Sequence, residues 1–161
     1  MLLKDLLYCY HNLMATLVLN KKASFNYEFI ERLEAGIELL GTEVKSLRSG
    51  NATLEGSYII IRGGEAFISG MTIPPYQVNN TAKDYEPERL RKLILTKNEI
   101  EKLAGIESKK GLTIVPVSMY NKNRKIKVDI AIARGKREFD KRETIKKRDS
   151  DREIQRTLKG N

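Results

Sequence analysis

The stretch Lys125-Ile126-Lys127-Val128-Asp129-Ile130-Ala131-Ile132-Ala133 alternates large apolar residues with polar or small ones. This period of two is typical of a β-strand with one buried face and one exposed face. The run before it, residues 112–120, is also rich in β-forming residues, and residues 121–124 between the two runs suit a turn. The two runs therefore predict an antiparallel hairpin. Pro116 lacks an N–H for the ladder, so we expect the first strand to be at an edge or bulged there.

A second hairpin is predicted around Gly63-Gly64, because such a pair admits the positive φ angles of a tight turn. Its strands are residues 57–62 and 65–70. Residues 73–76, with two prolines, break the ladder, and residues 78–88 look like an extended polar connection. The remaining short β-prone runs are residues 15–19, 29–40 and 90–95.

Two short helices are expected between the strands. Thr42 is positioned to cap a helix over residues 43–49, in which Glu43 favours the positive N-terminus and Lys45 and Arg48 form a cationic face. Thr96 and Glu99 have the spacing of a capping box that opens a helix to about residue 108. Its buried stripe would be Ile100, Leu103, Ala104 and Ile106.

Many strands with few helices predict a mainly β fold: a small antiparallel OB-like β-barrel with two or three short helices and a basic C-terminal tail. An open sheet with helices on one face is the alternative. We expect an N-terminal extension at residues 1–14, a barrel at residues 15–134 and a tail at residues 135–161. Met14 is a candidate for the true start of translation.

Charge points to a polyanionic partner. The 161 residues contain 30 Lys and Arg against 21 Asp and Glu, a formal net charge of +9. Residues 1–82 carry 7 basic and 8 acidic residues, residues 83–133 carry 12 and 7, and residues 134–161 carry 11 and 6. Positive charge therefore accumulates toward the C-terminus, where each neutralised phosphate would release counterions.

The tail has few large apolar side chains, namely Phe139, Ile145, Ile154 and Leu158. These are too few to offset the backbone entropy of ordering the segment, so we expect it to be disordered when free and helical once RNA neutralises its charge. Phe139 offers a flat face for stacking on an unpaired base. A solubilising tail without a binding role is the plainer alternative.

Other chemistry finds little support. One cysteine, Cys9, and one histidine, His11, lie two residues apart without an orienting partner and cannot supply a zinc site, so neither catalysis nor a metal is expected. No phosphate-binding glycine motif and no cofactor site stand out. Residues 1–13 are too short and too polar to span a membrane. A single cysteine suits a cytoplasmic location.

Several motifs in order resemble the SmpB (small protein B) family of bacterial tmRNA-binding proteins. They are Leu19-Asn20-Lys21, residues 29–36, Gly41-Thr-Glu-Val-Lys-Ser-Leu-Arg48, Gly64-Glu-Ala-Phe67, Arg91-Lys-Leu-Ile-Leu95, Ala133-Arg-Gly-Lys136 and Asp140-Lys-Arg142. The resemblance covers residues 15–161. It implies a non-enzymatic, monomeric adaptor that binds the tRNA-like domain of tmRNA and delivers it to stalled ribosomes in trans-translation.

The resemblance also implies two sets of binding residues. The tmRNA candidates are Asn20, Glu34, Lys45, Ser46, Arg48, Lys92, Ile94, Lys122 and Asn123. The candidates for the ribosomal decoding centre and mRNA channel are Lys136, Arg137, Phe139, Asp140, Lys141, Arg142, Lys146, Lys147 and Leu158. Glu34 would organise neighbouring groups rather than touch a phosphate. The alternatives are a general single-stranded-RNA-binding OB-fold protein and an RNA-processing enzyme.

Overall fold

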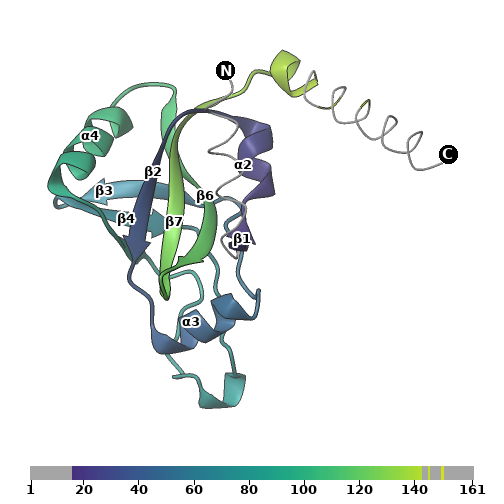
Figure 1. The fold of residues 1–161 in the computed structure, drawn as a ribbon, viewed down its shortest axis with the longest axis vertical. Coiled ribbons are helices and arrows are strands. Elements are labelled where there is room, and N and C mark those ends of the chain that lie inside the picture. Colours follow the sequence, from purple (N-terminus) through teal and green to yellow (C-terminus); the bar gives the residue numbers. More distant parts are fainter. Residues whose placement is uncertain (1–15, 143–144, 146–149, 151–161) are drawn as a thin grey trace.

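The computed structural model describes residues 16–142, 145 and 150. In this part of the chain, seven strands form one antiparallel sheet in the order β1-β6-β7-β2-β5-β4-β3 (Figure 1). The strands are β1 (Thr16–Leu19), β2 (Tyr27–Ile37), β3 (Tyr58–Arg62), β4 (Glu65–Ser69), β5 (Arg91–Ile94), β6 (Leu112–Lys122) and β7 (Lys125–Gly135). The helices are α2 (Lys21–Asn26), α3 (Gly41–Arg48) and α4 (Lys97–Glu107), with a short 3-10 helix at Val78–Asn80.

Both predicted hairpins are confirmed, and both turn within two residues. Gly63 and Gly64 have φ angles of 58° and 74°, and Asn123 and Arg124 have φ angles of 49° and 64°. Turns with two positive φ angles match the right-handed twist of the strands that they join. The β6–β7 turn is thus tighter than the four-residue connection expected from the sequence.

The bulge expected at Pro116 is also present. The register of β6 against β7 shifts between Pro116 and Ser118, while β6 lies between β1 and β7 and is not an edge strand. The carbonyl of Val117 accepts a hydrogen bond from the Asn20 N–H at 2.8 Å. The chain therefore accommodates the missing proline donor with an extra residue rather than by placing the strand at the edge.

The sheet is mainly antiparallel β as predicted, but it is not a closed barrel. β1 and β3 end the hydrogen-bonded order, and α4 packs against both β3 and β6. On β3, the Ile61 N–H donates to Glu107 Oε2 of α4 at 3.2 Å. α4 therefore covers part of the free edge of β3, which would pair with another strand in a closed barrel.

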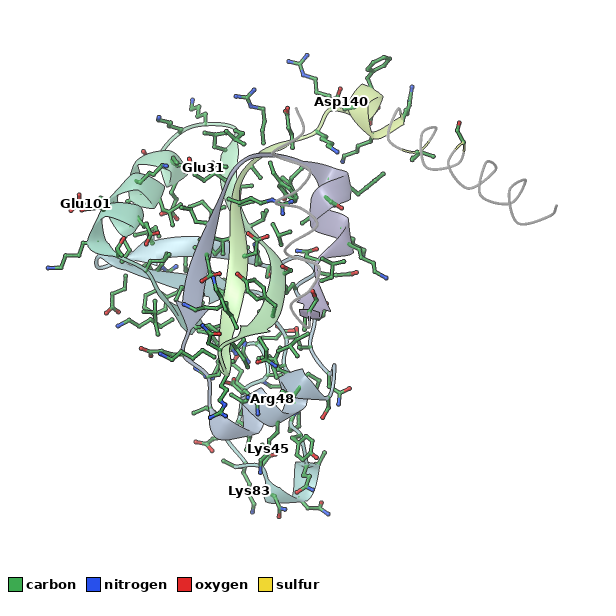
Figure 2. The ribbon with its side chains drawn as sticks, viewed as in Figure 1. Glu31, Lys45, Arg48, Lys83, Glu101 and Asp140 are labelled. Carbon is green, nitrogen blue, oxygen red and sulfur yellow. The ribbon has the colours of Figure 1, made fainter. Side chains whose placement is uncertain are left out.

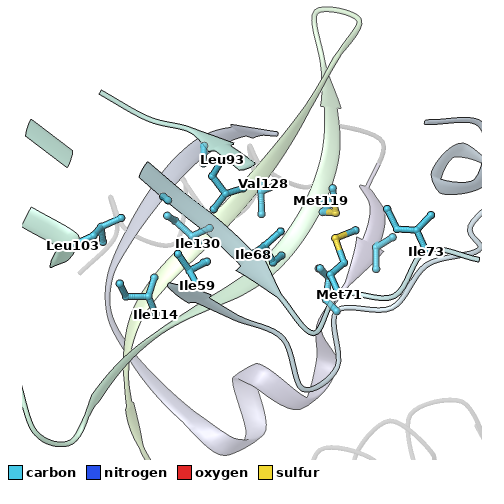
Figure 3. Close-up of a cluster of buried hydrophobic side chains, with 14 of the residues drawn as sticks. Ile59, Ile68, Met71, Ile73, Leu93, Leu103, Ile114, Met119, Val128 and Ile130 are labelled. Carbon is cyan, nitrogen blue, oxygen red and sulfur yellow. The ribbon is translucent and has the colours of Figure 1, made fainter. Parts of the chain in front are cut away.

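The main hydrophobic core lies inside the curve of the sheet (Figure 3). Ile68, Met71, Leu93, Leu103, Met119, Val128 and Ile130 are fully buried there. Alternate residues of β7 contribute Val128, Ile130 and Ile132, as the period of two predicted. Removing this apolar area from water is the main stabilising contribution to the fold.

The other face of β7 was expected to be exposed, and over its second half this expectation is wrong. Ala131 and Ala133 are fully buried and pack with Ala23 of α2 in a second apolar cluster that Tyr27 and Phe29 border. α2 lies outside the two helices whose bounds were predicted. Its placement over β2 and β6 covers the small side chains of the outer face (Figure 1).

α3 begins two residues earlier than predicted. Leu40, not Thr42, is the residue before the first turn, and its N–H donates to Glu43 Oε2 at 2.8 Å. Glu43 is 1% exposed rather than at the surface. The expected capping box of α4 is present, with Thr96 Oγ1 accepting from the Glu99 N–H at 3.4 Å and Glu99 Oε2 accepting from the Thr96 N–H at 2.8 Å. Leu103 is buried as expected, but Ala104 is exposed.

Glu43 belongs to a buried polar network that ties α3 to β5. Its carboxylate accepts hydrogen bonds from Arg89 Nη2 at 2.6 Å and from Arg91 Nε at 3.0 Å. Arg91 is completely buried and also donates to the carbonyls of Met71 and Pro87, each at 2.8 Å. Because every charge in this network has partners, its burial is tolerated.

The described part of the tail begins with a helical turn. Residues 138–142 are helical, as are residues 145 and 150. Most of the tail beyond residue 142 lies outside the described residues, and its disorder in the free chain stays a prediction. Lys136 precedes the turn and is anchored to the body, since its N–H donates to the Asn26 carbonyl at 2.9 Å and its Nζ donates to the Ser24 carbonyl at 3.1 Å.

Candidate nucleic-acid interface

One cluster of polar and charged side chains spans three neighbouring strands, and we call it the Glu34 cluster: Glu34, Tyr120, Lys122 and Lys127. Glu34 Oε2 accepts hydrogen bonds from the Tyr120 hydroxyl at 2.5 Å and from Lys122 Nζ at 2.8 Å. Lys127 Nζ lies 3.8 Å from Glu34 Oε1. The cluster therefore presents two ammonium groups that one carboxylate holds in place.

The electrostatics of the cluster favour an ionised Glu34. Partial burial raises the pKa of this carboxyl, but the hydrogen bonds from Lys122 and Tyr120 and the charges of Lys122 and Lys127 lower the pKa below its ordinary value. Burial and the bond to Glu34 raise the pKa of Tyr120, which stays a neutral donor. Tyr120 and Lys127 were not singled out from the sequence, although the alternation of β7 places Lys127 on the polar face.

The next strands extend this surface. Ile94 of β5 pairs with Gly36 of β2 and is 57% exposed. A side chain at Gly36 would bring a Cβ within 3.1 Å of Ile94 Cβ, so glycine here lets Ile94 lie flat over β2. Lys92 Nζ forms an ion pair with Glu65 of β4. Ile94 thus adds an apolar side chain beside the cations of the Glu34 cluster.

The β6–β7 turn lies at the same end of the sheet. Asn123 and Arg124 are exposed at its tip, directly after Lys122. Asn121, just before, has a buried Oδ1 atom for which no hydrogen-bond partner is found among the described residues. No side-chain hydrogen bond or ion pair of Asn123 or Arg124 is found among the described residues, so both side chains are available for contacts to a partner.

α3 supplies a second cationic surface. Lys45 and Arg48 are exposed and lie at the end of the molecule that also carries Lys83 (Figure 2). No ion pair or side-chain hydrogen bond of Lys45 or Arg48 is found in the part of the chain that the structure describes. Both charges are therefore available to phosphates.

Two of the predicted contact residues are buried instead. Ser46 is 0% exposed, and its hydroxyl lies 2.6 Å from the Pro74 carbonyl, to which it donates. Asn20 is 4% exposed, donates to the carbonyls of Leu54 at 2.9 Å and Pro116 at 3.0 Å, and accepts from the Ala23 N–H at 3.0 Å. In this structure both side chains join segments of the body, and a direct contact of either with RNA stays a prediction.

The second predicted set lies on the tail. Phe139 is 69% exposed, and Asp140 Oδ2 accepts from the Arg137 N–H at 3.1 Å, as the third helical residue does in a capping box. Lys141 extends from the same turn, and Arg142 lies 3.8 Å from Glu138 in an exposed i,i+4 pair. Lys146, Lys147 and Leu158 lie outside the described residues.

β7 joins the two sets. The Glu34 cluster and the β6–β7 turn lie near Lys125, whereas the tail leaves from Gly135 (Figure 1). At about 3.4 Å per step, the ten steps from Lys125 to Gly135 span roughly 34 Å, and the eight steps from Lys127 to Gly135 span about 27 Å. Two surfaces able to contact polyanions are therefore held apart on one rigid element.

Neither a metal centre nor a membrane segment is found in the described residues. No group of three or more metal-ligating side chains occurs there, and no helix is long and apolar enough to cross a membrane. Cys9 and His11 lie outside this part of the chain.

A curled antiparallel sheet with cationic side chains at its end, on a neighbouring helix and on a tail defines a compact, basic β-sheet protein suited to nucleic acid. The chain belongs to the SmpB family, whose model, described as "SmpB protein", matches residues 17–160. This is a family of RNA-binding proteins.

The chain is similar to curated relatives called "SsrA-binding protein". It is 48% identical to the protein of Gloeothece citriformis over 87% of this chain and 90% of the relative. It is 49% identical to the protein of Malacoplasma penetrans over 91% of this chain and 99% of the relative. A solved structure described as "tmRNA-SmpB: a journey to the center of the bacterial ribosome" matches 79% of this chain and 92% of its own chain, with a TM-score of 0.63 and 41% identity.

Proposed function

We propose that this chain is the adaptor of trans-translation: it binds the tRNA-like domain of tmRNA and delivers it to ribosomes stalled on a message. Membership of the SmpB family and the likeness to a tmRNA-SmpB structure in a ribosomal context support this function. The chain would act as a monomer, without a cofactor, in the cytoplasm where ribosomes translate.

The single observation that carries the proposal is the separation of the two cationic surfaces along β7. An adaptor must contact two RNAs at once, and β7 runs about 27 Å from Lys127 of the Glu34 cluster to Gly135, where the tail begins, which keeps the two surfaces from competing for one partner. A general single-strand binder would instead favour a continuous groove that follows one backbone.

We propose that the tmRNA surface comprises the Glu34 cluster, Asn123, Ile94 and the α3 cations Lys45 and Arg48. Lysines held by a carboxylate and an exposed arginine can contact phosphates, while Ile94 can contact a sugar or base face. Asn20 and Ser46 would act by positioning α2 and α3, because their side chains are buried and hydrogen-bonded. Lys92 would contribute at the margin, beside Glu65.

We propose that the tail is the ribosome-binding segment, as a unit distinct from the body at residues 15–134. Phe139 is positioned to stack on an unpaired base, and Arg137, Lys141 and Arg142 to neutralise phosphates around it. Lys136 fixes the point of departure through its two bonds to α2. Lys146, Lys147 and Leu158 would continue this surface along the tail.

Competition binding tests the proposal. Labelled tmRNA from the same organism is bound to the full chain, and unlabelled bulk tRNA or single-stranded RNA is added in excess. An adaptor for tmRNA retains the label, whereas equal displacement by single-stranded RNA would favour the general binder. Tagging of nascent chains on stalled ribosomes, measured with and without the protein, tests delivery.

A further inference from the structure

A cavity of about 570 Å³ opens between α2 and the turn that leads into β3. Its lining includes Lys22, Asn26, Tyr27, Glu55, Tyr58 and Thr113. The volume is within the range of sites that bind small organic molecules or single nucleotides. None of these six residues belongs to the two candidate surfaces described above; Asn20, which also lines the cavity, is one of the predicted tmRNA contacts.

The inner wall of the cavity is preformed. Ala23 and Val115, which also line it, are 2% exposed and belong to the second apolar cluster. Asn20 is fixed by three side-chain hydrogen bonds, and the Ser57 hydroxyl bonds to the Leu54 carbonyl. A ligand would therefore meet walls that need little rearrangement, which lowers the entropic cost of binding.

Three polar side chains around the cavity are candidates to bond a ligand. Among the residues that the structure describes, the side chains of Asn26, Tyr58 and Thr113 make no hydrogen bond. An amide offers both donors and an acceptor, and hydroxyl groups can take either role. Tyr27 and Tyr58 add two aromatic rings, and such rings are the usual stacking partners of unpaired bases.

An ion pair connects the two sides of the cavity. Lys22 of α2 and Glu55 of the opposite turn approach to 2.5 Å, and their side chains are 65% and 47% exposed. An exposed pair contributes little to stability, so Lys22 can exchange its partner at small cost. A phosphate would compete with Glu55 for this ammonium group.

We propose that this cavity binds one unstacked nucleotide of an RNA. The base stacks on a tyrosine ring, Asn26 and Thr113 bond to its edge, and Lys22 exchanges Glu55 for the phosphate of that nucleotide. The inference rests on the proposed RNA-binding function and adds a site to it. The nucleotide comes either from tmRNA or from ribosomal RNA, and the cavity lies beside the start of the tail, since Lys136 bonds to the Asn26 carbonyl.

Mononucleotides test the site without any large RNA. The ¹⁵N-labelled full chain is titrated with AMP, GMP, CMP and UMP, and saturable shifts are expected at the Asn26 side-chain amide and the Gly56 backbone amide. Tyr58→Leu should weaken this binding about tenfold by removing a stacking face. Glu55→Gln should strengthen it, because Lys22 loses its competing carboxylate. Glu101→Gln, on α4, is the matched control and should leave the affinity unchanged.

Two outcomes would overturn the site: no saturable shift at the cavity with any nucleotide, or equal affinity in wild type, Tyr58→Leu and Glu55→Gln. Identical shifts with inorganic phosphate alone would refute base recognition. Because Glu55→Gln predicts a gain, a folding defect in Tyr58→Leu cannot imitate the expected pattern.

The source of the nucleotide is then assigned by measuring the affinity of Tyr58→Leu for tmRNA and, separately, for small ribosomal subunits. A loss of affinity of about tenfold in one arm identifies that RNA, and no loss in either arm overturns a role in RNA binding. Failure of the proposed function is recognised differently, because wild-type protein would then show no preference for tmRNA whatever the mononucleotide result.

Discussion

Glu34 Oε2 lies 2.8 Å from Lys122 Nζ, although β7 runs between the strands that carry these two residues. The side chains reach across the intervening strand, where Lys127 also approaches the same carboxylate. A negative charge in a proposed RNA-binding surface thus serves to position two positive ones.

Glu34→Gln should reduce the preference for tmRNA over bulk tRNA severalfold. The change removes the carboxylate that positions Lys122 and Lys127, so their charges stay but their arrangement is lost. The measurement is the ratio of dissociation constants at one salt concentration. Glu31→Gln is the matched control, since Glu31 lies on the same strand and pairs with Lys102 at 2.5 Å. An unchanged ratio for Glu34→Gln would remove the proposed organising role.

Lys45→Ala combined with Arg48→Ala should weaken tmRNA binding and flatten its salt dependence. Two lost phosphate contacts correspond to a decrease of up to about two in the slope of log affinity against log salt. The slope is measured between low and physiological salt. Lys109→Ala with Lys110→Ala removes the same charge from an exposed segment after α4, and should change the slope less. Equal effects of the two double variants would mean that only net charge matters.

Glu43→Ala should lower the free energy of unfolding by about 3–5 kcal/mol, since it leaves the completely buried Arg91 without its carboxylate. Urea unfolding at neutral pH measures the change. Glu101→Ala alters an exposed carboxylate and should change stability by less than about 0.5 kcal/mol. If Glu43→Ala lowered the free energy of unfolding by as little as Glu101→Ala, the buried polar network around Glu43 would contribute little to stability.

The same residue predicts a pH dependence. Burial raises the pKa of Glu43, but the bonds from Arg89, the Leu40 N–H and Arg91 lower the pKa below its ordinary value of 4.5. Its contribution to stability is therefore present above that value and is lost as the pH falls through the lower pKa of the folded state. Glu43→Gln should flatten the decline in the free energy of unfolding below about pH 5. If the free energy of unfolding of Glu43→Gln fell as steeply as that of the wild type, the acid sensitivity would come from other carboxylates.

A chain that ends at Lys136 should fold and bind tmRNA like the full chain while failing to support tagging on stalled ribosomes. A chain that ends at Gly135 also loses the two hydrogen bonds to α2, and should be less stable by about 1–2 kcal/mol. Thermal unfolding, tmRNA affinity and tagging are measured for both. Tagging at the full level without the tail would contradict its proposed role, and a large loss of tmRNA affinity would contradict the separation of the two surfaces.

Local chemistry explains which parts of the fold were predictable. Gly63-Gly64, Pro116 and the Thr96–Glu99 box each have a steric or hydrogen-bonding property that limits the backbone to few conformations. The strands, turns and bulge that depend on them were predicted from residues close in sequence. The period of two in β7 also predicted its inward side chains.

Long-range partners explain what was missed. Glu43 looked like a surface residue at a helix end, but it is buried because Arg89 and Arg91 reach it from a segment more than forty positions away. Ala131 and Ala133 looked exposed until α2 was seen to cover them. Lys122 and Glu34 were both selected, yet their contact depends on strand order, which a pattern within one strand does not contain.

The length of β7 has a consequence for the geometry of any complex. If the two proposed partners bind at its two ends, the number of residues in this strand sets the distance between them. Deleting two neighbouring residues would keep every remaining side chain on its own face of the pleat, yet would shorten that distance by about 7 Å. The length of the strand would thus set the spacing of the two partners, and only changes of two residues at a time would alter it without exchanging the two faces of the sheet.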